Sequence, residues 1–281
     1  MKPEIIAHVQ NANGFIFDMD GTIALGDAAS GGHKALPFAT ETLAALRARG
    51  IPYRVFTNGT ARPPAAYAAS LRNAGFDLRD DEMMTPSSSA AIWFLKQGIT
   101  RVRVLGNAGV CAPLEDAGIT VIGPTETASG VEAVYTGWFR EFTFPDMEAA
   151  CQSIWDGAIL TTASHVPFFA TETGRAIGAS FAINVMITSL TGKRAKVLGK
   201  PSRIAFDAAA RSMGFGPTAA KNIVVVGDDP GLEMRMANGA GAVSIGMTTG
   251  LMQRDAVPAL SNVETPMALL DSLAPLLDAV T

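Results

Sequence analysis

The chain has 281 residues, a mass of 29.3 kDa and a formal net charge of −4. A hydrophobic content of 48% with 17% charged residues is typical of a folded protein with a substantial core, and the length suits two domains. The net charge argues against a general nucleic-acid binder, because such proteins normally carry a basic face.

The cysteines and the apolar segments indicate a cytoplasmic protein. Cys111 and Cys151 have neither metal-ligand spacing nor the density of a disulfide scaffold, so we expect free thiols. The N-terminal residues lack the apolar core of a signal peptide. The longest apolar run, residues 181–190, is interrupted by Asn184 and is too short to span a bilayer, so no membrane partner is expected.

The first notable stretch is FIFDMDGT, residues 15–22. Its three apolar residues are typical of the end of a buried strand, and Asp18 and Asp20 follow two residues apart. Side chains alternate along a strand, so both carboxylates point the same way if the strand continues that far. Neighbouring carboxylates repel each other unless a cation or a shared proton relieves the repulsion. The pair therefore indicates a functional site.

The next elements are predicted from apolar periodicity and from the proline or glycine residues at their ends. A small glycine-rich flap is expected at residues 26–36, and a strand at 53–56 ends in the polar sequence TNGT. Helices are expected at 38–49, 65–73 and 90–97, the last of them capped by PSSS at residues 86–89.

A second alternation of strands and helices begins near residue 99. Strands are expected at 101–105, 119–122, 131–135 and 158–162, and helices at 108–117 and 146–155. This alternation predicts that residues 99–178 form a smaller α/β domain. It is inserted in a first domain that consists of residues 1–98 and 179–281.

The remaining segment returns to the first domain. Residues 223–226 are four successive β-branched residues, and they predict a buried strand that ends in GDD. A further strand is expected at 242–245, and helices at 180–190, 202–213, 232–238 and 267–277. Strands that alternate with helices predict a doubly wound, mostly parallel α/β sheet.

Four polar positions share one feature, because each lies at or just beyond the C-terminal end of an expected strand. They are Asp18 with Asp20, Thr57, Lys200 and Asp228. Ligands bind at this edge of open α/β sheets, so the positions are expected to converge. Carboxylate oxygens suit Mg²⁺, whereas the donors at Thr57 and the charge of Lys200 suit a phosphoryl group.

Four short motifs resemble, in their order along the chain, the four motifs of the haloacid dehalogenase (HAD) superfamily. They are DMDGT, the TN after the second strand, the lysine of GKP and the first acid of GDD. The inserted domain lies where that superfamily has its type II cap. Within it, VYTGW, FTFPDMEAA and TTASH are similar to the NagD-like, or p-nitrophenylphosphatase-like, phosphatases with a type IIA (C2a) cap. The resemblance spans essentially the whole chain and implies a Rossmann-like core with an inserted cap.

The resemblance implies a Mg²⁺-dependent phosphatase that works through an aspartyl-phosphate. Asp18 would be the nucleophile, and Asp20 would protonate the leaving alcohol and then deprotonate the attacking water. The residues that would bind the phosphoryl group are Thr57, Asn58, Gly59 and Lys200. The metal would be held by Asp18, by the backbone carbonyl of Asp20 and by Asp228.

Two features depart from the family pattern. The second acid of the fourth motif falls five residues after the first, where this chain has Glu233, and Asp229 is the alternative. We rank Glu233 first because Asp229 faces away from Asp228 on strand periodicity. The flap at 26–36 is longer than usual and lacks its common aromatic residue, which leaves the fit of the substrate open.

Two histidines and two phenylalanines are further candidates for which we compare a functional and a structural role. His165 lies where NagD-like caps lower a specificity loop over the site, so it is a candidate substrate contact, and an exposed loop histidine is the alternative. Phe168 and Phe169 follow it and are candidates for an apolar leaving-group pocket. His33 has no partner pattern and is expected at the surface.

The leading hypothesis is a phosphatase for small phosphorylated metabolites, such as sugar phosphates, phosphoglycolate, nucleotides or p-nitrophenyl phosphate. A phosphoacceptor signalling module with the same Asp, Thr, Lys and Mg²⁺ is the alternative, which Asp20 and the insertion both disfavour. A nicotinamide-dependent oxidoreductase shares the fold class, but GNAG at residues 106–109 lacks the third glycine of the dinucleotide fingerprint. A homodimer is expected from the resemblance, because caps of this type often pair.

Overall fold

The computed structural model describes residues 1–27, 32–171, 174–216 and 218–281. Its contacts divide the chain into two compact units. The first unit consists of Met1–Thr57, Ala65–Met84 and Ala205–Thr281, and the second of Asn58–Pro64 and Thr85–Ile204. The expected inserted domain, residues 99–178, falls within the second unit, and its boundaries stay a prediction.

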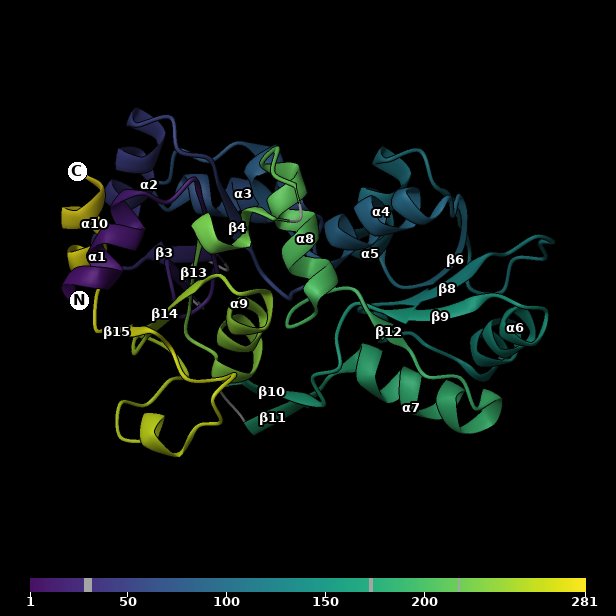
Figure 1. Cartoon of the computed structure of the whole chain (residues 1–281). Coiled ribbons are helices and arrows are strands. Elements are labelled where there is room, and N and C mark those ends of the chain that lie inside the picture. Colours follow the sequence, from purple (N-terminus) through teal and green to yellow (C-terminus); the bar gives the residue numbers. More distant parts are fainter. Residues whose placement is uncertain (28–31, 172–173, 217) are drawn as a thin grey trace. The chain divides into compact units, whose positions relative to one another are not determined.

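The first unit is built on a six-stranded sheet with the order β15-β14-β13-β1-β4-β5 (Figure 1). Its pairs are parallel. The strands are β1 (Gly14–Phe17), β4 (Tyr53–Phe56), β5 (Met83–Met84), β13 (Ile223–Gly227), β14 (Val243–Met247) and β15 (Ala268–Leu270). The sheet confirms the predicted fold class, and β1 and β13 are buried along their whole length, as their apolar runs require.

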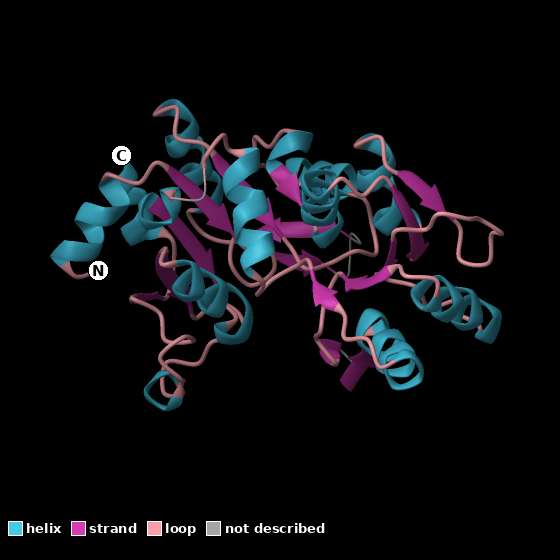
Figure 2. Cartoon of the chain, turned by 45° about the vertical axis from the view of Figure 1, so that its right-hand side comes forward, coloured by secondary structure: helices cyan, strands magenta, loops and turns pink. Residues whose placement is uncertain are grey.

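Helices surround this sheet (Figure 2). They are α1 (Pro3–Gln10), α2 (Ala39–Ala48), α3 (Pro64–Asn73), α8 (Arg203–Ser212), α9 (Arg235–Ala240) and α10 (Ala274–Val280), with a π-helical turn at Pro230–Met234. A two-stranded antiparallel hairpin, β2 (Ala24–Asp27) with β3 (Gly32–Ala35), follows β1. The hairpin occupies the expected flap, of which residues 28–31 lie outside the described residues.

The second unit has a five-stranded parallel sheet with the order β12-β9-β8-β6-β7. Its strands are β6 (Arg101–Leu105), β7 (Thr120–Ile122), β8 (Ala133–Thr136), β9 (Ile159–Thr162) and β12 (Lys196–Val197). Its helices are α4 (Pro86–Gln97), α5 (Ala108–Asp116), α6 (Phe144–Trp155) and α7 (Ala179–Thr191), and a hairpin joins β10 (Phe168–Thr171) to β11 (Gly174–Ile177).

Side chains from the two faces of the second sheet pack into two separate hydrophobic cores. Val102 and Val104 of β6 pack in one cluster with residues of α4 and α5. Leu105 and Val134 belong to another cluster with residues of α6 and α7. The sheet of this unit is therefore covered on both faces, which is what the strand–helix alternation predicts.

Two expected elements differ from the structure. The helix expected at 267–277 is wrong, because Ala268–Leu270 pairs with β14 as an edge strand and the helix α10 begins only at Ala274. The helix expected at 90–97 begins at Pro86, because Thr85 caps it and the backbone N–H of Thr85 donates to Ser88 Oγ (3.2 Å). The residues expected to cap this helix, 86–89, therefore form its first turn.

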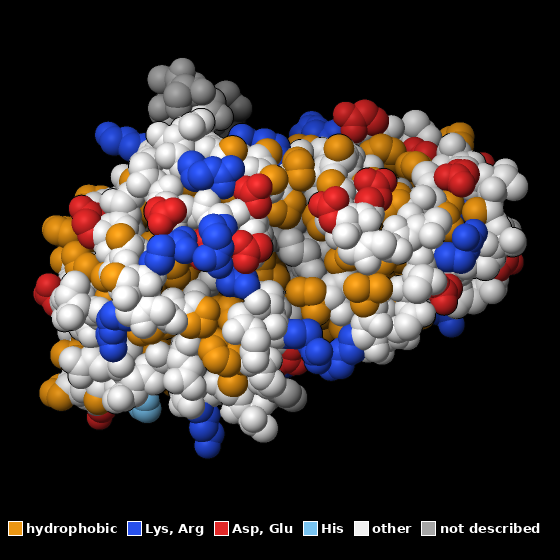
Figure 3. Space-filling view, turned by 90° about the horizontal axis from the view of Figure 1, so that it is seen from above, with side chains coloured by type: hydrophobic (Ala, Val, Ile, Leu, Met, Phe, Trp, Pro, Cys, Tyr) orange, Lys and Arg blue, Asp and Glu red, His pale blue; other side chains and the backbone are white. Residues whose placement is uncertain are grey.

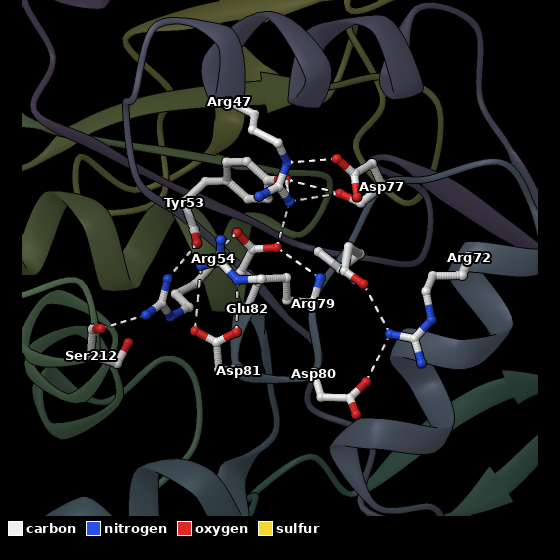
Figure 4. A network of polar contacts seen from close by, with 11 residues as sticks. Arg47, Tyr53, Arg54, Arg72, Asp77, Arg79, Asp80, Asp81, Glu82 and Ser212 are labelled. Carbon is white, nitrogen blue, oxygen red and sulfur yellow. Dashed lines mark hydrogen bonds and ion pairs between the residues drawn. The ribbon is translucent and has the colours of Figure 1, made fainter.

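A network of hydrogen bonds and ion pairs joins α2, β4 and the 3₁₀ turn Asp80–Glu82 (Figure 4). Glu82 is buried at its centre, and its Oε2 accepts from Arg47 Nη2 (2.7 Å) and from the backbone N–H of Arg79 (2.8 Å). The bond to Glu82 raises the pKa of Arg47. The network therefore stabilises the side of the sheet formed by β4 and β5.

Replacing Glu82 by glutamine is expected to lower the free energy of unfolding by about 2 kcal/mol, because a buried charge-assisted pair loses its charge. Asp81→Asn is the matched control, since Asp81 pairs with Arg79 at an exposed site and such pairs contribute about 0.5 kcal/mol. Urea unfolding followed by circular dichroism measures both. Equal losses in the two variants would contradict the stabilising role of Glu82.

Acidic and basic side chains are interspersed on the face that Figure 3 shows, with hydrophobic side chains between them. Among the described residues, no helix has the length and apolar character that crossing a membrane requires. Cys111 and Cys151 are free cysteines, and burial raises the pKa of the Cys111 thiol to about 11. This thiol is therefore protonated near neutral pH.

Candidate active site

Asp18 and Asp228 follow two neighbouring strands. Phe17 of β1 lies beside Val226 of β13 in parallel register, and the backbone N–H of Asp18 donates to the Val226 carbonyl (2.9 Å). Both carboxylates therefore begin at the same edge of the sheet. Asp18 is 8% exposed and Asp228 5% exposed, so each is largely removed from water.

Glu233 completes a cluster with these two residues. One carboxylate oxygen of each of Asp18, Asp228 and Glu233 lies within 4.8 Å of the others. Glu233 comes from the π-helical turn after β13 and is 1% exposed, and its Oε2 accepts from the backbone N–H of Asp229 (3.1 Å). Three buried carboxylates in this space repel one another unless a positive charge lies among them.

Glycines make the room that these carboxylates occupy. A Cβ atom at Gly250 would overlap Asp228 Oδ2, and one at Gly227 would overlap the side chain of Glu233. Asp228 Oδ2 also accepts from the backbone N–H of Leu251 (2.7 Å). The backbone therefore approaches the acids closely and orients Asp228.

The donor set of this cluster fits Mg²⁺. All three groups supply hard carboxylate oxygens, which are the ligands that Mg²⁺ prefers, and few protein ligands leave positions for water or for a substrate oxygen. Thr22 Oγ1 donates to Asp18 Oδ2 at 3.4 Å, so one Asp18 oxygen already has a nearby neutral donor. The observation that speaks for a cation is the burial of three like charges together.

Asp229 has a different task from Glu233. Its Oδ1 accepts from the backbone N–H of Gly231 (2.7 Å) and so caps the π-helical turn. Glu233, by contrast, is the acid that reaches the cluster. Which of the two supports a metal stays a prediction, and this geometry favours Glu233.

Asp20 lies in a different environment from Asp18. The side chains of Asp18 and Asp20 were expected to point the same way only if β1 continued to Asp20. The strand ends at Phe17, and Asp20 forms an isolated bridge with Ala24. Its side chain is 57% exposed. The expectation that His33 is a surface residue is wrong, because its side chain is 5% exposed and its Nε2 lies 3.6 Å from Asp20 Oδ1.

The remaining predicted positions lie in both units. Thr57 is buried at the end of β4, where its backbone N–H donates to the Met84 carbonyl (3.2 Å). In the second unit, Asn58 Nδ2 donates to the Lys200 carbonyl and the Lys200 N–H donates to Asn58 Oδ1, both at 3.0 Å. Gly59 follows Asn58 in the same unit. The structure therefore joins the Asn and Lys motifs by reciprocal hydrogen bonds.

His165 lies in the loop that leads to β10. Its ring packs edge-on against Phe181 of α7, with centroids 6.0 Å apart, and desolvation lowers its pKa. Phe168 and Phe169, on β10, are exposed. Contact of these residues with a substrate stays a prediction.

Sequence comparison identifies two matching family descriptions. "Haloacid dehalogenase-like hydrolase" matches residues 15–120, and "HAD-hydrolase-like" matches residues 197–276. Among individual proteins, the 5'-nucleotidase YutF of Bacillus subtilis is 26% identical over 261 residues, which cover 92% of this chain and 95% of that protein.

Solved structures agree with these matches. The 4-nitrophenylphosphatase of Thermotoga maritima superposes with a TM-score of 0.83 at 25% identity, over 98% of this chain and 99% of that one. NagD of Escherichia coli K-12 superposes with a TM-score of 0.81 at 22% identity, over 94% of this chain and 98% of that one. The two family descriptions include the acids at the ends of β1 and β13. The chain therefore belongs to the haloacid dehalogenase-like hydrolases.

Proposed function

We propose that this protein is a Mg²⁺-dependent phosphatase that hydrolyses small phosphorylated metabolites through an aspartyl-phosphate at Asp18. The observation that carries the proposal is the buried cluster at the ends of β1 and β13, where Asp18 and Asp228 meet Glu233. A cluster of three acids of this kind is costly to bury without a function, because each charge raises the energy of the others.

The reaction has two steps. A carboxylate oxygen of Asp18 attacks phosphorus, the bond from phosphorus to the leaving oxygen breaks, and Asp20 gives that oxygen its proton. The Asp20 carboxylate then takes a proton from water as the water oxygen attacks phosphorus, the bond to Asp18 breaks, and inorganic phosphate leaves. The exposed side chain of Asp20 suits this role, since it exchanges protons with both an alcohol and water.

Asp18, Asp228 and the backbone carbonyl of Asp20 would hold Mg²⁺, and Glu233 would support them. When bound, Mg²⁺ supplies positive charge that offsets the charge of the phosphoryl oxygens. The family resemblance assigns the phosphoryl oxygens to Thr57 and Lys200, and this assignment is part of the proposal. The cytoplasmic location and the homodimer also stay predictions.

The 5'-nucleotidase and the 4-nitrophenylphosphatase among the similar proteins support a phosphomonoester substrate. The test is phosphate release by the purified protein with Mg²⁺ from p-nitrophenyl phosphate, phenyl phosphate, nucleoside monophosphates and sugar phosphates. We expect release from the aryl phosphates and stronger activity, as kcat/KM, on one class of metabolite. Absence of release from every compound would end the proposal.

A further inference from the structure

The side chain of His33 joins two segments of the first unit that lie far apart in sequence. Its Nδ1 is 2.8 Å from Ser70 Oγ on α3, and its Nε2 is 3.6 Å from Asp20 Oδ1. The imidazole is 5% exposed, whereas the Asp20 side chain is 57% exposed. A buried ring therefore lies beside one oxygen of a carboxyl group whose side chain is largely exposed.

The local fold places His33 beside Asp20. His33 pairs with Gly26 in the hairpin β2–β3, and the backbone N–H of Leu36 donates to the Ile23 carbonyl (2.9 Å) at the base of the hairpin. The backbone N–H of Gly21 donates to Ala24 (2.9 Å) and closes the turn that carries Asp20. The histidine and the acid thus belong to one hydrogen-bonded segment.

The contact with Ser70 bears on which nitrogen of the His33 ring carries the proton. When its hydroxyl donates to Nδ1, the ring carries its proton on Nε2, and that N–H faces Asp20 Oδ1. Ser70 is itself buried on α3. The distance of 3.6 Å is longer than a hydrogen bond, and catalytic contacts of this kind commonly shorten when a substrate binds.

We propose that His33, oriented by Ser70, is a positioning residue for Asp20. It fixes Oδ1 of the carboxyl group, so that the other oxygen is presented to the leaving group. This inference rests on the proposed function, in which Asp20 delivers a proton to the leaving oxygen. When the contact with His33 is removed, the carboxyl group reaches the productive orientation less often, and proton transfer slows.

The test compares two leaving groups of the same shape. Phenolate is a strong base and needs a proton as it departs, whereas p-nitrophenolate is a weak base and departs with little help. In His33→Ala, kcat/KM for phenyl phosphate is expected to fall by about 10-fold to 100-fold, and for p-nitrophenyl phosphate by less than about 3-fold. This parameter covers only the steps up to departure of the leaving group, so later hydrolysis does not mask the difference.

Further variants separate positioning from folding. His33→Gln retains a donor near the Nε2 position and is expected to recover part of the phenyl phosphate activity. Ser70→Ala is a small change that leaves the imidazole in place, and we expect a loss of about 3-fold to 10-fold with phenyl phosphate alone. His8→Asn, at an exposed position of α1, is the matched control and leaves both substrates unchanged.

Each remaining outcome counts against a stated claim. Equal losses with the two substrates in His33→Ala and Ser70→Ala, or no loss in either, would overturn the positioning role. Equal losses would instead indicate that His33 only anchors the hairpin to α3. If the unaltered protein releases phosphate from neither substrate, the proposed function itself fails, and the two failures are thereby distinguished.

Discussion

Asp18→Asn is expected to lower kcat by about 10⁴-fold or more, because the amide is a very weak nucleophile and no covalent intermediate forms. The change is nearly isosteric and lies at the end of β1, so the packing around Phe17 and Val226 is retained. In Mg²⁺-free buffer the variant is expected to be more stable than the unaltered protein, because it removes one of three mutually repelling charges. Loss of activity with a gain of stability is not what general damage to the fold produces.

Rapid mixing with p-nitrophenyl phosphate followed by acid quenching tests the chemistry directly. The unaltered protein should carry a phosphoryl group that hydroxylamine releases, and Asp18→Asn should carry none. Asp278→Asn, an exposed acid on α10, is the charge-matched control and should keep full activity. A phosphoprotein that persists for minutes to hours would support the signalling alternative, and full activity in Asp18→Asn would exclude the proposed nucleophile.

The sequence was most informative where one strand carries its own signal. The apolar runs at residues 15–17 and 223–226 predicted buried strands, and the structure has β1 and β13 there. The acids that follow these strands come together because parallel neighbours end at one edge of the sheet. The convergence of Asp18 and Asp228 could therefore be predicted from the local sequence pattern and the geometry of parallel sheets.

The contact between His33 and Asp20 could not be predicted from the sequence. It depends on the register of β2 with β3 and on Ser70, which lies 37 residues from His33. A lone histidine in a glycine-rich segment gives no periodic signal, so the surface was the expected location. The turn that carries Asp20 is set by backbone bonds to Ala24, which apolar periodicity does not encode.

The edge strand β15 illustrates a related difficulty. Residues 267–277 have the leucine content of a helix, yet Ala268–Leu270 extend beside β14. Such a short apolar run suits either element, and only the available edge of the sheet decides between them. Glu233 is an intermediate case, because its spacing from Asp228 matched the family, while its place in the cluster depends on a π-helical turn.

Removal of divalent metal with EDTA is expected to abolish phosphate release, and Mg²⁺ is expected to restore it. Mg²⁺ should also raise the melting temperature of the protein without substrate, because a cation that binds only the folded state stabilises it and relieves the repulsion of three buried carboxylates. Asp228→Asn should lose this rise, and Glu233→Gln should need about 10-fold to 100-fold more Mg²⁺ for half-maximal activity.

Asp229→Asn separates the two candidate supporting acids. Asp229 caps the π-helical turn through Gly231 N–H, so its replacement is expected to lower stability slightly and to leave the Mg²⁺ requirement nearly unchanged. A requirement that rises as much in Asp229→Asn as in Glu233→Gln would show that the choice of Glu233 is wrong. If Mg²⁺ does not change the melting temperature of the unaltered protein, the proposal of a metal site is wrong. The three carboxylates within 4.8 Å would then be stable without a cation.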